Sequence, residues 1–150
     1  CVKGQVVLIT GGEGELGREL GLEFAQLGCN VAIFYNNKRE FAESCIFIRE
    51  LQKIGIKAFA YQVNISNCEE VLKLKNQIEK DVGCVDIVLN NAAILFTRRI
   101  DDESPTTIEY AMQVNVLSLF WVSTICFKGI YRTNYFFFFL LRQQIHFWNQ

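Results

Sequence analysis

A glycine-rich loop near the N-terminus constrains the fold of this chain more than any other feature. The loop, Thr10–Gly17, follows an apolar run at residues 5–10 and precedes a segment in which leucine and phenylalanine recur at helical spacing. Glycine permits backbone conformations closed to other residues and lets the chain approach a pyrophosphate closely. The free N–H groups at the start of the following helix would face that anion. A strand, a glycine loop and a helix in this order therefore predict a dinucleotide-phosphate site.

Strand and helix patterns alternate along the first 126 residues. Strands are predicted at four apolar runs, residues 5–10, 31–34, 57–63 and 85–90. Helices are predicted between and after them, at residues 16–27, 38–54, about 67–82 and 105–126. Because this alternation requires right-handed crossovers, it predicts an α/β fold. The expected architecture is a doubly wound parallel sheet of the Rossmann type, incomplete, with strand order 3-2-1-4.

Local signals predict where the helices begin and which residues they bury. Gly28, Gly55 and Gly83 are expected to end the first three helices. Ser66 or Asn67 is expected to cap the third helix, and Ser104-Pro105 to open the fourth. The second helix carries on one face Phe41, Cys45, Ile48 and Leu51. The apolar face of the third helix comprises Val71, Leu74 and Ile78, and the fourth runs through Met112, Val116, Leu119 and Phe120.

The pattern changes at about residue 127. Phenylalanine is unbroken from Phe136 to Phe139, and a glutamine-rich end follows. A fifth buried strand fits the length of this run. A terminus foreign to the fold, such as translated intron sequence, fits four consecutive phenylalanines equally well. The expected organisation is a nucleotide-binding half-domain at residues 1–126 and an atypical phenylalanine-rich segment at residues 127–150.

Composition excludes several classes of partner. Fifteen basic and sixteen acidic residues give a net charge of −1, so no basic footprint for nucleic acid is present. Six cysteines without a CxxC pair, and a single histidine at His146, provide no zinc-ligand spacing, so no metal is expected. Reduced structural thiols are expected. With no secretory signal and no run of about eighteen apolar residues, the chain is placed on the cytoplasmic side without an anchor of its own.

Three motifs resemble the short-chain dehydrogenase/reductase family. The family pattern Thr-Gly-x-x-x-Gly-x-Gly is matched at Thr10, Gly11, Leu16 and Gly17. Asn90–Ala93 resembles the family's Asn-Asn-Ala-Gly, and Val114–Val116 resembles its Asn-Val segment. The residues of these motifs most resemble those of the branch that acts on retinol, steroids and other lipid alcohols, including 17β-hydroxysteroid dehydrogenases. The resemblance implies an NAD(P)-dependent oxidoreductase with a lipid alcohol or ketone as substrate, and it allows association with the endoplasmic reticulum or lipid droplets.

The same resemblance implies which residues bind the cofactor. They are Gly11, Gly12, Gly14, Leu16, Gly17, Tyr35, Asn64, Ile65, Asn91, Ala92 and Ala93. Asn115 is implied in a supporting catalytic role. Each polar member has a purely structural alternative: a turn for Asn64, a strand end for Asn91, and a backbone-bonded helix asparagine for Asn115.

The choice between NAD and NADP stays open in the sequence. At the end of the second strand, where a carboxylate would favour NAD, the chain has Tyr35. Lys38 and Arg39 are close enough to suggest a 2′-phosphate, but they also fit the solvated start of a helix. Glu13, beside the expected phosphate, argues against NADP.

Two departures from the family pattern bear on activity. The middle glycine of the loop is replaced by Glu15, whose charge would repel a phosphate; a shifted register through Gly12, Gly14 and Gly17 would restore G-x-G-x-x-G. The family's serine and Tyr-x-x-x-Lys pair have no counterpart, because no lysine follows a tyrosine by four residues.

Three hypotheses follow from these departures. The chain is the cofactor half of an oxidoreductase, truncated and inactive alone. Alternatively, it is a non-catalytic nucleotide-binding module that dimerises through the helix at residues 105–126. The third hypothesis is a fragment without function.

Overall fold

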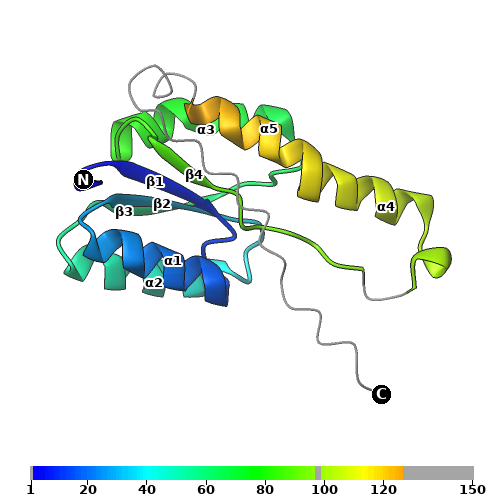
Figure 1. Cartoon of the computed structure of the whole chain (residues 1–150), viewed down its shortest axis with the longest axis horizontal. Coiled ribbons are helices and arrows are strands. Elements are labelled where there is room, and N and C mark those ends of the chain that lie inside the picture. The colour runs from blue at the N-terminus through cyan, green and yellow to red at the C-terminus, as the bar shows by residue number, and fades with distance from the viewer. Residues whose placement is uncertain (1, 97–98, 127–150) are drawn as a thin grey trace.

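The predicted parallel sheet is present, and its strand order is the expected one. A computed structural model describes residues 2–96 and 99–126 of the chain. Its four strands are β1 (Val6–Thr10), β2 (Asn30–Tyr35), β3 (Ala58–Gln62) and β4 (Ile87–Leu89). They pair in parallel in the order β3-β2-β1-β4 (Figure 1). The predicted α/β class and the 3-2-1-4 order are therefore confirmed.

Helices cover both faces of the sheet. On one face lie α1 (Glu15–Gln26) and α2 (Phe41–Lys53) (Figure 1). On the other lie α3 (Cys68–Asp81) and a helical segment made of α4 (Pro105–Met112), a π-helical turn at Gln113–Leu117 and α5 (Ser118–Ser123). Short 3₁₀ turns at Ile100–Asp102 and Thr124–Cys126 complete the described elements. Each strand of the sheet therefore buries apolar side chains in two separate cores.

Successive side chains of β1 are buried alternately in the two cores. Val7 and Ile9 are buried with Phe47 and Leu51 of α2, whereas Leu8 is buried on the opposite face with residues of α3 and α5. Successive strand residues point to opposite faces. A strand covered by helices on both sides therefore needs an uninterrupted apolar run, which is what β1 carries.

The first helix packs closely through its smallest residues. Gly17, Gly21 and Ala25 are its buried positions, whereas Leu27, just after the helix, is 57% exposed. A β-carbon on Gly21 would come within 2.7 Å of the Phe47 ring. The close approach of α1 to α2 therefore depends on glycine rather than on large apolar side chains.

The sequence prediction for α2 is wrong in its start and in part of its face: Leu51 and Ile48 belong to the core as predicted, whereas Phe41 does not. The helix begins at Phe41 rather than near Lys38, because residues 36–40 form a turn held by the Glu40 carboxylate. Its buried positions are Ser44, Phe47 and Leu51, and the Phe41 side chain is 55% exposed. Starting three residues later leaves Phe41 in the first turn, beyond the sheet, where its ring packs against Tyr35.

The predicted starts of the third and fourth helices are confirmed. Asn67 rather than Ser66 caps α3, since its side chain accepts from the N–H groups of Glu69 and Glu70. Val71 and Ile78 of α3 are buried and Leu74 packs beside them. Ser104 caps α4 by accepting from the N–H of Thr107, and Pro105 is its first residue.

Large apolar residues of the last helical segment lie on its outer side. Val114, Ser118 and Val122 are buried against the core, whereas Met112 and Phe120 are exposed. The predicted phenylalanine-rich segment from residue 127 lies outside the described residues, and the proposed boundary between residues 126 and 127 stays a prediction. Within the described chain, no helix has both the length and the apolar character required to cross a membrane.

Candidate functional site

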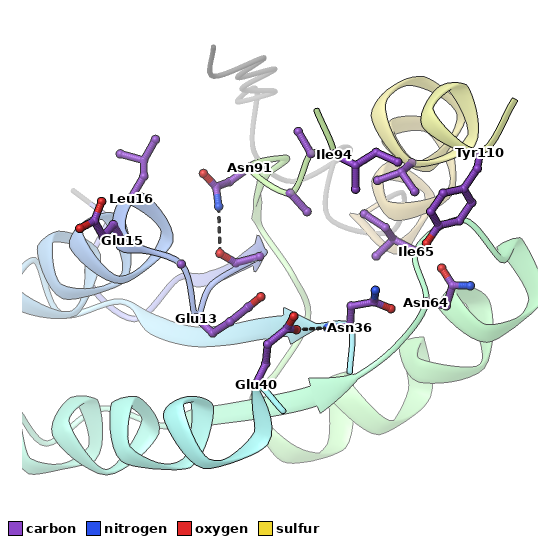
Figure 2. Close-up of a pocket in the computed structure, with 15 residues that line it drawn as sticks. Glu13, Glu15, Leu16, Asn36, Glu40, Asn64, Ile65, Asn91, Ile94 and Tyr110 are labelled. Atoms are coloured by element: carbon purple, nitrogen blue, oxygen red, sulfur yellow. Dashed lines mark hydrogen bonds between the residues drawn. The ribbon is translucent and has the colours of Figure 1, made fainter. Parts of the chain in front are cut away.

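A cavity of about 230 Å³ opens at the carboxyl ends of β1, β2 and β4. Loops that follow all four strands contribute to its wall, and α4 closes one side (Figure 2). In a doubly wound sheet, ligands bind at this edge, where the strand order reverses. The lining residues are Gly11, Glu13, Gly14, Glu15, Leu16, Asn36, Glu40, Asn64, Ile65, Asn91, Ala92, Ala93, Ile94, Tyr110 and Val114.

The loop between β1 and α1 takes the register in which Gly11 makes the first turn. Gly11 has a φ of +62°, which favours glycine, and a β-carbon there would lie 3.1 Å from the Cα of Ala92. A β-carbon on Gly12 would come within 2.5 Å of Ile33, and one on Gly17 would collide with the Gly11 carbonyl oxygen. Gly14 is extended, and a β-carbon there would make an ordinary contact of 3.5 Å with the Gly11 carbonyl oxygen. The alternative register through Gly12, Gly14 and Gly17 is therefore not the one adopted.

The start of α1 is suited to an anion except for one residue. Its N-cap, Gly14, supplies no side-chain acceptor, so the first-turn N–H groups stay available. Glu15 is the first helical residue and is exposed at the rim of the cavity. In Figure 2 its carboxyl group points away from the carboxyls of Glu13 and Glu40. A phosphate could reach the helix, but it would share the positive end of the dipole with Glu15.

Thr10 and Asn91 tie the loop after β1 to the loop after β4. The buried Thr10 hydroxyl accepts from the backbone N–H groups of Asn91 and Ala92, each at 3.0 Å. The Asn91 side-chain amide donates to the Thr10 carbonyl oxygen at 3.0 Å. It also donates to the Gly11 carbonyl oxygen at 2.9 Å (Figure 2). Two segments eighty residues apart are thereby held as one wall of the cavity.

Asn115 acts one layer behind the cavity. Its amide donates to the Ile94 carbonyl oxygen at 2.8 Å and accepts from the Ile94 N–H at 2.9 Å. Asn115 lies in the π-helical turn, an irregularity frequent at functional sites. The backbone-bonded role considered from the sequence is thus the one observed. Asn115 fixes the segment after β4 from behind, while Ile94 itself lines the cavity.

The end of β2 holds a carboxylate that the sequence analysis missed. The Glu40 carboxylate accepts from the N–H groups of Asn36 at 2.8 Å and Asn37 at 3.2 Å, and from the Asn37 side-chain amide at 2.6 Å. It therefore sits beyond the strand end although it comes from the next helix start. The signal was an acidic residue four positions after Asn36, in a segment assigned to a regular helix.

Glu13, which belongs to the loop after β1, lies beside Glu40. Figure 2 shows the two carboxyl groups pointing toward one another. Burial is the main cause that raises the pKa of Glu13, and the nearby carboxylates of Glu40 and Glu43 raise it further, to about 7. The Glu13 carboxyl group therefore gains or loses its proton near neutral pH.

Asn64 makes the turn considered for it from the sequence and also faces the cavity. Its side-chain oxygen accepts from the N–H of Ser66 at 3.1 Å and from the Ser66 hydroxyl at 2.8 Å, which is a turn. It also lines the cavity together with Ile65.

The other predicted site residues fall into three positions. Those lining the main cavity are Gly11, Gly14, Leu16, Asn64, Ile65, Asn91, Ala92 and Ala93. Tyr35 is only 7% exposed and lines a smaller adjoining cavity of about 50 Å³, while Gly12 and Gly17 are buried and line neither cavity. Tyr110 and Val114 were missed; their spacing of four residues, which places them on one face of a helix, could have indicated them.

The fold and the glycine loop define a dinucleotide-binding protein of the Rossmann class. The profile of the family described as short chain dehydrogenase matches residues 5–134. The chain therefore belongs to the short-chain dehydrogenase family. None of the described residues forms a group of three or more histidine, cysteine or acidic side chains arranged to hold a metal.

Similar proteins place the chain in the 17β-hydroxysteroid and retinol dehydrogenase-like branch. Bovine short-chain dehydrogenase/reductase family 16C member 6 is 37% identical over 80% of this chain and 37% of its own length. Human 17-beta-hydroxysteroid dehydrogenase 13 is 34% identical over 89% of this chain and 44% of its own length, and human epidermal retinol dehydrogenase 2 is 35% identical over 80% and 38%. The chain thus spans less than half the length of these relatives.

Solved structures agree on the fold. A short chain dehydrogenase from Burkholderia cenocepacia J2315 in complex with NADP has a TM-score of 0.78 and 25% identity, covering 85% of this chain and 51% of that one. A blue fluorescent protein from a metagenomic library in complex with NADPH has a TM-score of 0.80 and 23% identity, covering 85% and 52%.

Proposed function

We propose that this chain is the dinucleotide-binding half of an NAD(P)-dependent oxidoreductase that interconverts an alcohol and a carbonyl compound. The observation that carries the proposal is the cavity at the strand ends, lined by a loop in which Gly11, Gly12 and Gly17 are required by geometry. The names of its relatives, which include hydroxysteroid and retinol dehydrogenases, favour a lipid alcohol or ketone as substrate of the whole protein.

Each part of the cavity has a distinct task in this proposal. The first turn of α1 and the Gly11 turn bind the pyrophosphate, while Asn64 and Ile65 contact the adenine. Asn91, Ala92 and Ala93 form the wall beside the nicotinamide ribose, held by Thr10 and, through Ile94, by Asn115. When bound, the nicotinamide supplies the site of hydride transfer. The protein's residues bind and orient it.

A binding-only role is the second candidate function. Proton transfer to a carbonyl oxygen requires a positioned acid, and the 150 residues contain no tyrosine followed four residues later by a lysine. We therefore propose that these residues contribute binding rather than proton transfer. A transcript whose frame continues from residue 127 into a serine and a Tyr-x-x-x-Lys would favour the oxidoreductase; turnover of an alcohol by the 150-residue chain would contradict a binding-only role.

Calorimetric titration of the chain with NADH and NADPH tests the proposed function. Micromolar binding of at least one is expected. A matched pair of variants links binding to the loop. Gly17→Ala and Gly21→Ala, both in α1, place a β-carbon too close to a neighbour, which is the Gly11 carbonyl oxygen for the first and the Phe47 ring for the second. Only Gly17→Ala therefore disturbs the phosphate loop. Both should lower the melting temperature, and only Gly17→Ala should abolish binding. No binding by the wild-type chain would contradict the proposal.

We also propose that two copies associate through the helical segment 105–126. Phe120 is 59% exposed on this segment, with Met112 and Leu117 exposed beside it. Replacement of Phe120 by serine should shift the mass measured by light scattering toward that of the monomer. Leu27→Ser is the matched control, since Leu27 is equally exposed next to α1. A mass that is monomeric in the wild type would contradict this association.

Where the protein resides is also a proposal. From the family resemblance of the motifs, we propose the cytoplasmic face of the endoplasmic reticulum or of lipid droplets. Imaging of a tagged chain beside markers of both compartments tests this placement, and a diffuse signal would contradict it.

A further inference from the structure

Two carboxyl groups meet beyond the end of β2, although β2 itself ends without one. Glu40 is held there by three hydrogen bonds from Asn36 and Asn37. Ionised, a carboxylate offers about four acceptor positions, so one remains for a ligand. Glu13 enters from the loop after β1, and both glutamates line the cavity with Asn36.

Glu13 lacks a partner for half of its carboxyl group. Its Oε2 atom is buried and finds no hydrogen-bond donor among the described residues. A buried acceptor without a donor is costly, so a ligand hydroxyl that donated to it would be favoured. In Figure 2 this carboxyl group lies next to that of Glu40.

The position of the pair corresponds to one part of a dinucleotide. In a doubly wound fold, an acidic side chain after the second strand accepts from the adenosine ribose hydroxyls. The residue at the end of β2 is Tyr35, whose ring is buried and whose pKa is raised by that burial. The carboxylate expected at the strand end is absent, and two others occupy its surroundings.

We propose that Glu13 and Glu40 together accept the adenosine ribose hydroxyls and select NAD(H) against NADP(H). This inference rests on the proposed function, since it assigns the cofactor of the same cavity. A 2′-phosphate would bring negative charge against the carboxyl pair, whereas a 2′-hydroxyl would donate to it.

The charges around the pair support this selection. Beside the pair itself, Glu43 of α2 lies near enough to raise the pKa of Glu13 further. Glu15, at the start of α1, lines the same cavity, although its carboxyl group points away from the pair. No lysine, arginine or histidine among the described residues lines the cavity. Lys38 and Arg39 are exposed outside it. A 2′-phosphate would therefore meet carboxylates without a lining cation.

The selection should strengthen as the pH rises. The titratable groups that act on Glu13 are Glu40 and Glu43. Tyr35 lines the smaller cavity together with Glu13, while Glu15 and Tyr110 line the main one. Because the pKa of Glu13 is raised to about 7, the pair gains a second negative charge above that pH. A phosphate monoester has its second pKa at about 6, so the ligand itself changes little between about pH 7 and about pH 8.5. Affinity for NADPH should therefore fall more than affinity for NADH across this range.

The test is the ratio of NADH to NADPH affinity, measured by calorimetry on the whole chain. Wild type should prefer NADH by about tenfold or more. Glu13→Gln and Glu40→Gln should each reduce that preference several-fold, chiefly by improving NADPH binding. Glu43→Gln is the control: it removes the same charge nearby but does not line the cavity, so the ratio should change by less than about twofold.

The outcomes separate this inference from the proposed function. Equal affinities, a preference for NADPH, or a ratio that Glu13→Gln and Glu40→Gln shift no more than Glu43→Gln would overturn the inference while leaving the dinucleotide site intact. If neither dinucleotide binds, both are overturned. Should Glu40→Gln fail to fold because it holds the turn, Glu13→Gln decides the matter, since it leaves the Asn36–Glu40 contacts unchanged.

Discussion

At the scale of single residues, buried hydrogen bonds at Thr10 connect distant parts of the chain. Its hydroxyl oxygen accepts from two backbone N–H groups of the loop after β4. These donors lie in a partly buried region, so loss of their acceptor leaves them unsatisfied. Asn91 adds two more bonds across the same gap. The wall of the cavity therefore depends on a threonine that does not itself line it.

Thr10→Val should destabilise the chain by about 1–3 kcal/mol, because it keeps the shape and removes the acceptor. Thr10→Ser is the matched control, since it keeps the hydroxyl and loses only a methyl group. Urea unfolding followed by circular dichroism measures both. Equal stabilities of the two variants would contradict the role assigned to the hydroxyl.

Glu15 is the residue at which the phosphate loop departs most from its family pattern. It lies in the first turn of α1 at the cavity rim. Glu15→Gly should tighten NADH and NADPH binding alike, by about tenfold, because removal of one negative charge acts on the shared pyrophosphate. Glu19→Gln, one turn further along α1, should leave both affinities unchanged. If Glu15→Gly altered only one of the two affinities, Glu15 would lie beside the ribose rather than beside the pyrophosphate.

At the scale of elements, helix starts are set by short side-chain contacts, and their packing by longer-range fit. Asn67 and Ser104 accept from backbone N–H groups two or three residues ahead, and such caps depend on local sequence alone. The first helix, by contrast, packs through Gly17, Gly21 and Ala25. This helix carries leucines on more than one side. The side that faces the sheet is therefore decided by how closely the neighbouring helix packs against it.

Asn67→Ala should cost about 0.5–2 kcal/mol of stability through loss of the cap on α3. Asn76→Ala, an exposed substitution in the middle of the same helix, is the control and should be neutral or slightly stabilising. Thermal unfolding of both variants measures the difference. A cost for Asn76→Ala as large as that for Asn67→Ala would remove the case for the cap.

At the scale of the whole molecule, the carboxyl pair links stability to pH. The pKa of Glu13 is raised in the folded chain from 4.5 to about 7. Between these values the folded state binds more protons than the unfolded state. The contribution of Glu13 to the free energy of unfolding is therefore fully present below about pH 4.5. This contribution is lost as the pH rises through about 7.

Wild-type chain should accordingly lose roughly 1–2 kcal/mol of stability relative to Glu13→Gln between about pH 5 and about pH 8, with the full shift discounted because Glu13 is only partly buried. Urea unfolding at both pH values measures this difference. Glu23→Gln, at an exposed position of α1, should run parallel to the wild type. If the stability of Glu13→Gln changed with pH as that of the wild type does, the pKa of Glu13 would not be raised in the folded chain.

Much of this protein can be predicted from local sequence. The elements can be placed from three local features: apolar runs of strand length, helix ends at Gly28, Gly55 and Gly83, and a helix start at Ser104-Pro105. The glycine loop after the first strand, together with Asn90–Ala93, locates the cavity. These features follow from backbone sterics, hydrogen bonding between near neighbours and side-chain periodicity, which residues close in sequence determine by themselves.

Only the tertiary structure decided which side chains converge. From the sequence, Tyr35 is the residue in the carboxylate position; in the folded chain Tyr35 is buried, and the carboxyl groups come from Glu13 and Glu40. The buried face of α2 and the contact of Asn115 with Ile94 were settled in the same way. Contacts between side chains far apart in the chain depend on how the elements pack. A local pattern of residues does not determine the distance between such side chains in the folded chain.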